Sequence, residues 1–137
     1  MLELFVQNML TTTAPASVAS VVGNRVYVGI IPKDCTYPAV RYTAIDFSPG
    51  ERTSSGKQHS TKQALFQIDI YGNSYLDAAL IANAINEHFD GYHGTVDSAY
   101  GNYVIQLVEV TSQRPDFESD LEIHSQTIEL TIIYQRV

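Results

Sequence analysis

The hydrophobic pattern of the first 23 residues predicts two short helices. Apolar residues recur at three- and four-residue spacings from Leu2 to Leu10, which is the stripe of an amphipathic helix. Pro15 suits the first turn of a second helix, and Gly23 suits its left-handed C-terminal cap. We therefore expect two helical pieces before residue 24.

Three strands are expected in the next part of the chain. Residues 25–31 are mostly β-branched or aromatic, and Pro32 ends this run. A longer strand over 39–47 follows Pro38, whose missing amide donor is tolerated at a strand start. In 64–72 apolar and polar side chains alternate, which is the period of a half-buried strand.

The segment 48–62 predicts a flexible polar loop that joins two antiparallel strands. It has glycines and a proline but no large apolar residue. Its charge is mainly basic, with Glu51 as its acid and these candidate contact residues: Arg52, Lys57, His59 and Lys62. Because loops longer than about 12 to 15 residues in compact domains are often functional or disordered, we expect this segment to be either a flexible solvated loop or a contact with a partner.

A longer helix is expected to begin at a cap residue, Asn73 or Ser74, and to end at Gly91. Ser74, with Asp77 three residues later, is typical of a capping box at a helix start. Alanines allow a close approach to a sheet, and Gly91 ends the helix. The apolar stripe expected to face the sheet is Leu76, Leu80, Ile81, Ala84, Ile85 and Phe89.

The C-terminal part predicts a β-hairpin. One strand is expected over 103–110, and strong alternation over 127–134 indicates the last strand. Arg114-Pro115-Asp116 is expected to break the chain between them. The predicted fold class is α+β, an antiparallel sheet with the long helix on one face and short N-terminal helices.

Composition limits the function classes. At 137 residues and 45% hydrophobic content, we expect one domain with one core. The net charge of −7 argues against a general affinity for nucleic acid. No apolar stretch approaches the roughly 18 to 20 residues of a membrane helix, and the N-terminus lacks the basic region of a signal peptide. We expect a protein made in the cytoplasm, with no membrane partner.

No motif for catalysis, a cofactor or a metal is present, and the sequence predicts a protein that is not an enzyme. Cys35 is the single cysteine, which excludes an intrachain disulfide. His88 and His93 are five residues apart, whereas zinc proteases use a spacing of four with a glutamate between; a weak surface metal site there remains the alternative. There is no nucleophile-elbow pattern and no phosphate-binding glycine loop.

A second candidate contact lies towards the C-terminal hairpin. Five acids gather there near one basic residue, Arg114: Glu109, Asp116, Glu118, Asp120 and Glu122. They are either a solvated hairpin end or a docking or lumen-lining patch, which would repel the DNA backbone and let it slide past. The candidate residues are Arg114, Asp116, Phe117 and Glu118.

The order of segments also suggests a family. The relevant segments, in chain order, are Gly23-Asn24-Arg25-Val26-Tyr27, Tyr37-Pro38-Ala39-Val40, Gln67-Ile68-Asp69-Ile70-Tyr71-Gly72 and Ile133-Tyr134-Gln135. With the N-terminal helices they cover nearly the whole chain, which resembles the tail completion (tail terminator, head–tail joining) proteins of long-tailed double-stranded DNA bacteriophages.

The resemblance implies a structural virion protein at the neck of the tail. Such a protein is monomeric or weakly associated when free, and forms a hexameric ring that caps the head-proximal end of the tail tube. The ring ends tail polymerisation, joins the tail to the head–tail connector or stopper protein, and leaves a lumen through which DNA passes. The basic loop and the acidic hairpin are expected to meet between neighbouring subunits, the head-to-tail contact that closes rings.

Two alternatives remain at the level of sequence. The first is another neck component, a stopper or adaptor, which also forms rings. The second is a small cytoplasmic α+β ligand-binding dimer or enzyme that uses Tyr92, His93 and nearby carboxylates in a pocket.

Overall fold

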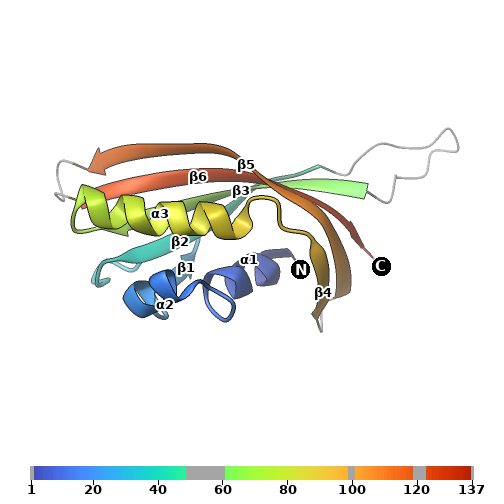
Figure 1. The fold of residues 1–137 in the computed structure, drawn as a ribbon, viewed down its shortest axis with the longest axis horizontal. Coiled ribbons are helices and arrows are strands. Elements are labelled where there is room, and N and C mark those ends of the chain that lie inside the picture. The colour runs from blue at the N-terminus through green and yellow to red at the C-terminus, as the bar shows by residue number, and fades with distance from the viewer. Residues whose placement is uncertain (1, 49–60, 99–100, 119–122, 137) are drawn as a thin grey trace, which may run out of the picture.

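The computed structural model describes residues 2–48, 61–98, 101–118 and 123–136. Within these ranges it contains three helices and six strands (Figure 1). The helices are α1 (Leu2–Leu10), α2 (Ala16–Val22) and α3 (Tyr75–Phe89). The strands are β1 (Val26–Val28), β2 (Ala39–Ser48), β3 (Thr61–Gly72), β4 (Gly94–Ser98), β5 (Gly101–Glu118) and β6 (Ile123–Arg136).

The strands form one sheet in the order β1-β2-β3-β6-β5-β4. Every neighbouring pair is antiparallel except β1 and β2, which run parallel with Val26 opposite Val40. The expected α+β class is confirmed, and the sheet is mixed because β1 returns to β2 through the ten residues 29–38. The hairpin partners β5 and β6 pair as expected, as do β2 and β3.

The core lies between one face of the sheet and the helices. The long helix α3 packs against β3, β6 and β5, and α1 and α2 pack against α3. Alternate side chains of the two central strands are fully buried against the helices, among them Phe66, Ile68, Ile128, Leu130 and Ile132. The alternation of apolar and polar residues in these strands therefore identifies the side chains that lie on the helix-covered face of the sheet.

Local contacts position α3 on the sheet. The Asp77 amide donates to the Ser74 Oγ at 3.1 Å, which confirms the predicted N-cap. Gly72 at the end of β3 approaches α3 so closely that a Cβ there would lie 3.0 Å from the Ala78 nitrogen. The chain leaves the helix through Gly91, whose φ is 79°, and the Gly91 amide donates to the Val108 carbonyl of β5.

The expected break at Pro115 was wrong, the strand expected over 25–31 is only Val26–Val28, and one strand was not expected. Pro115 does not break the chain, because β5 continues to Glu118 with Pro115 opposite Gln126. This part of β5 pairs with β6 alone, since β4 pairs only with Gly101–Ile105, and proline is tolerated in such an edge segment. The short strand β4, which lies outside the expected elements, forms the opposite edge of the sheet from β1.

The expected apolar face of α3 was partly wrong. Ile81, Ile85 and Phe89 are buried as expected, but Leu76 and Leu80 are 65% and 59% exposed. Ala78 and Ala82, two of the alanines that were expected to allow a close approach to the sheet, take sheet-facing positions, both with no exposed area. Because α3 lies this close to the strands, small side chains fill the interface, and the helix turns the two leucines towards solvent.

Candidate functional site

The described strand ends that flank the two predicted contact segments lie at opposite ends of the sheet. Arg52, Lys57 and His59 lie outside the described residues, whereas Lys62 is at the start of β3. In the register of β3 and β6, Thr61 pairs with Gln135 at one end and Gly72 pairs with His124 at the other. The eleven steps between these ends span about 37 Å at roughly 3.4 Å per residue. The ends of β2 and β3 that flank the basic segment are therefore at the opposite end of the sheet from the β5–β6 hairpin.

The second predicted segment lies at the end of β5. Arg114, Asp116 and Phe117 are exposed on this strand, and Glu118 is its last residue. The Asp116 carboxylate accepts a hydrogen bond from the Phe117 amide at 2.8 Å. The acids Asp120 and Glu122 of the same segment lie outside the described residues.

Aromatic side chains gather beside this segment. The Phe117 and His124 rings lie 4.7 Å apart, and the Tyr75 ring at the start of α3 stands edge-on to His124 at 6.2 Å. Phe117 and Tyr75 are both about half exposed, which gives this end of the sheet two aromatic side chains open to a partner. Partly exposed aromatic rings of this kind are frequent anchors in protein–protein interfaces.

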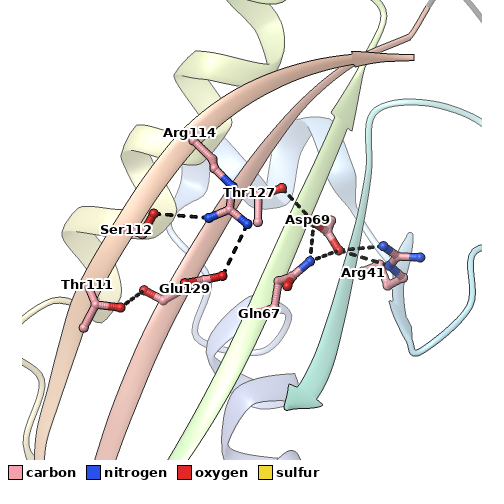
Figure 2. A network of polar contacts seen from close by, with 8 residues as sticks. All are labelled: Arg41, Gln67, Asp69, Thr111, Ser112, Arg114, Thr127 and Glu129. Atoms are coloured by element: carbon pink, nitrogen blue, oxygen red, sulfur yellow. Dashed lines mark hydrogen bonds and ion pairs between the residues drawn. The ribbon is translucent and has the colours of Figure 1, made fainter.

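The face of the sheet away from the helices has a buried ionic centre (Figure 2). The Asp69 carboxylate of β3 is only 4% exposed and accepts hydrogen bonds from Arg41 of β2 at 2.7 and 3.2 Å. Gln67 donates to it at 3.1 Å, and the Thr127 hydroxyl of β6 donates at 2.9 Å. A buried carboxylate is stable only when it is paired and hydrogen-bonded, and this one links three strands.

The same network affects the ionisation of Arg41. Burial acts to lower the pKa of Arg41, but the hydrogen bond to Asp69 and the charges of Tyr71 and Asp69 outweigh it, so the pKa is raised. Arg41 is therefore a permanent cation in this network.

A second, more exposed pair lies next to the first on β5 and β6 (Figure 2). The Arg114 guanidinium donates to the Glu129 carboxylate at 3.3 Å and to the Ser112 hydroxyl at 3.3 Å. The Thr111 hydroxyl donates to the Glu129 backbone carbonyl at 3.2 Å. One of the predicted contact residues, Arg114, is thus already engaged within its own chain.

An open apolar groove lies between α2 and α3. It has a volume of about 390 Å³ and is lined by Ser17, Val21, Asp77, Leu80, Ile81, Asn83, Ala84 and Glu87. Its lining includes the exposed apolar side chains of Val21 and Leu80 and the carboxylates of Asp77 and Glu87, and the Arg25 guanidinium donates to the Val21 carbonyl beside it. The sequence pattern placed Leu80 in the core, so this surface could be recognised only once the packing of α3 was known.

The residues of the ligand-binding alternative do not form this groove. The Tyr92 ring packs against Phe5 of α1 with centroids 5.2 Å apart, and its carbonyl accepts from the Val108 amide. His93 is exposed. In the part of the chain that the structure describes, no group of three or more His, Cys, Asp or Glu residues could hold a metal ion. None of the helices described here is long and apolar enough to cross a membrane.

The fold has solved relatives at low sequence identity. No family model matches the chain, and no curated protein matches it. A chain in a solved structure, described as "Virion of native gene transfer agent (GTA) particle", superposes with a TM-score of 0.65 at 13% identity. The match covers 90% of this chain and 87% of that chain. At this identity the likeness establishes a shared fold over nearly the whole length.

Proposed function

We propose that this protein is a structural virion protein of a long-tailed phage or phage-like particle, and that it acts as a tail terminator. The observation that supports this most is the shared fold with a chain of a gene transfer agent virion over 90% of the length. The order of segments in the sequence, which resembles tail completion proteins, points independently to the same class. The protein is made in the host cytoplasm and is incorporated at the neck of the tail.

In this proposal the protein works by binding. A hexameric ring of copies caps the head-proximal end of the tail tube and ends tube polymerisation. Its other surface receives the head–tail connector or stopper protein. The net charge of −7 disfavours retention of DNA, so the genome passes through the lumen without specific binding.

The separation of the described strand ends beside the two contact segments suits a protein with several partners. The segment from Arg52 to Lys62 is the candidate contact with the tail tube or with a neighbouring subunit. The segment from Arg114 to Glu118, with the exposed Phe117 ring, is the second candidate contact. Because the described strand ends next to these segments lie about 37 Å apart, one copy can engage two partners at once.

The decisive test is to image the purified protein, mixed with headless tails or assembled tail tubes, by negative-stain microscopy. A ring at one tube end, formed from a protein whose free mass is that of a monomer, is the expected result. A ring that binds portal or connector particles but not tubes would instead identify another neck component. A stable free dimer without tube binding would overturn the proposal in favour of the ligand-binding alternative.

Charge reversal tests the contact made by the basic segment. The double variant Arg52→Glu with Lys57→Glu should weaken ring formation on tubes, lengthen tails and reduce infectivity, since opposite charges steer and hold such contacts. Thr95→Glu, an added carboxylate at an exposed position of β4, measures the general effect of added negative charge. Unchanged tail length and infectivity in the double variant would remove the basic segment from the contact.

A further inference from the structure

The side chain of His88 links α3 to α1. His88 lies in the last turn of α3, and its ring makes a hydrogen bond with the backbone of Met9, which is next to the last residue of α1. The ring also stands edge-on to Phe89, with centroids 5.9 Å apart. Both helices lie on the same face of the sheet, so this one side chain holds the end of α1 against the end of α3 (Figure 1).

One nitrogen of the His88 ring has no partner. The Nε2 atom is buried, and no described residue forms a hydrogen bond with it. The bond to Met9 is therefore made by Nδ1, which donates to the backbone carbonyl. In this neutral tautomer Nε2 has a lone pair and no proton. A second proton would make Nε2 a buried donor without an acceptor, which is unfavourable.

The surroundings of His88 offer Nε2 no compensating charge at hydrogen-bond distance. The helices α1 and α2 contain one ionisable side chain, Glu3, which is six residues or about 9 Å along the axis from Met9. The helix-facing side chains of β3 from Ala64 to Ile70, and of β6 from Gln126 to Ile132, are uncharged. The other ionisable side chains of the last turn of α3, the turn after it and the adjoining part of β5 are Glu87, Asp90, Tyr92, His93 and Glu109.

Apolar contacts hold the rest of α1. The Phe5 ring packs against Phe89 and Tyr92, with centroids 6.4 and 5.2 Å apart. The other buried side chains of α1 are Leu2, Val6, Met9 and Leu10. In the part of the chain that the structure describes, no ion pair attaches α1, and no strand pairing includes it. Separation of α1 from α3 therefore leaves the hydrogen bonds of the sheet in place.

We propose that α1 is a pH-sensitive element, which separates from α3 when the buried Nε2 of His88 takes up a proton from solvent. The imidazole becomes an imidazolium, and no covalent bond of the chain breaks. Separation gives the new N–H access to water and exposes the aromatic side chains of Phe5, Phe89 and Tyr92.

The direction of the pH dependence follows from the burial of the ring. Burial lowers the pKa of His88 below its usual value of 6.5 when α1 is in place. The attachment of α1 is therefore at full strength above about pH 6.5 and weakens as the pH falls below it. The inference goes beyond the proposed function, because it concerns contacts within a single chain.

Hydrogen exchange of the whole chain tests this inference. Amide protection is measured by mass spectrometry in steps from about pH 7.5 to about pH 5, with correction for the intrinsic exchange rates. Protection in α1 should fall by up to about tenfold per pH unit below about pH 6.5, because one proton is coupled to the opening. The amides of β3 and β6 should keep their protection within about twofold.

The Met9 methyl group gives a second readout. Met9 is 4% exposed and is one of two methionines, so a methyl-labelled sample gives a simple NMR spectrum. Its resonance should move towards the position of an exposed methionine, with the same midpoint as the ring resonances of His88. A different midpoint, or titration of His88 without any movement of the Met9 methyl resonance, would overturn the inference.

Histidine variants provide the controls. His88→Gln and His88→Phe cannot take up the proton, so both should remove the pH dependence of protection in α1. His93→Gln, at the exposed histidine five residues further on, should leave it unchanged. Retention of the pH dependence in either His88 variant would overturn the inference, as would a joint loss of protection in α1, β3 and β6. If the His88 variants do not fold, the Met9 methyl titration of the unsubstituted protein decides.

Discussion

The buried carboxylate of Asp69 gives the sharpest prediction about stability. Substitution Asp69→Ala removes the acceptor shared by Arg41, Gln67 and Thr127. Thr127 is a buried residue, so its hydroxyl is left without this partner at a cost of about 1 to 3 kcal/mol. Breaking a fully buried ion pair costs about 3 to 5 kcal/mol, but the Arg41 side chain is 30% exposed and regains contact with water.

The expected loss in unfolding free energy is therefore about 2 to 4 kcal/mol. For a chain of 137 residues, this corresponds to a decrease in Tm of roughly 10 °C. Calorimetry and urea denaturation of the two proteins measure both quantities. A double-mutant cycle with Arg41→Ala should show coupling, because the two residues share a hydrogen-bonded pair.

The second ion pair on the same face is the matched control. Arg114 and Glu129 have side chains that are 51% and 34% exposed, so Arg114→Ala should cost less than about 1 kcal/mol. Both pairs join an arginine to a carboxylate on the same face of the sheet, so the comparison isolates the effect of burial on the contribution of the pair to stability. If Asp69→Ala lowers Tm no more than Arg114→Ala does, burial of the Asp69 carboxylate is not what makes this network stabilising.

Three further predictions concern α3. Ser74→Ala removes the acceptor of the Asp77 amide and should lower the unfolding free energy by about 1 kcal/mol in urea denaturation; no change would show that the cap is not stabilising. Gly72→Ala places a Cβ 3.0 Å from the Ala78 backbone nitrogen and should cost about 1 to 3 kcal/mol, and an unchanged Tm would contradict this close approach. Burial lowers the pKa of His88, and this effect outweighs a backbone hydrogen bond with Met9, which acts to raise the pKa. Because the folded state resists protonation, stability should be full above the unfolded pKa of about 6.5 and fall as the pH drops through it, and the variant His88→Gln should lose this decrease in pH-dependent melting. Equal pH profiles for the two proteins would refute the role of His88.

Local sequence signals predicted most of the fold. The alternation in β3 and β6, the Ser74 cap and the amphipathic first helix each depend on residues that are close in sequence. The structure places helices and strands close to the expected positions for this reason. The β5–β6 hairpin followed from two adjacent alternating strands.

The errors share one physical cause, which is dependence on distant neighbours. Pro115 is compatible with β5 because only β6 pairs with that part of the strand, and no local pattern reports how many neighbours a strand has. The short strand β4 forms because it pairs with the segment of β5 from Gly101 to Ile105. The parallel direction of β1 follows from how residues 29–38 return to the sheet.

For the candidate contact surfaces too, some properties follow from the sequence and others only from the tertiary structure. The sequence by itself determined the charges of the segments 48–62 and 114–118, the helix starts and the faces of the central strands, because these are properties of residue types and short-range period. Only the tertiary structure decided that the described strand ends beside the two segments lie at opposite ends of the sheet, that Arg41 and Asp69 meet across 28 residues, and that Leu80 lines an open groove. These facts depend on strand register and on the closeness of α3 to the sheet, which arise from contacts between residues far apart in the chain.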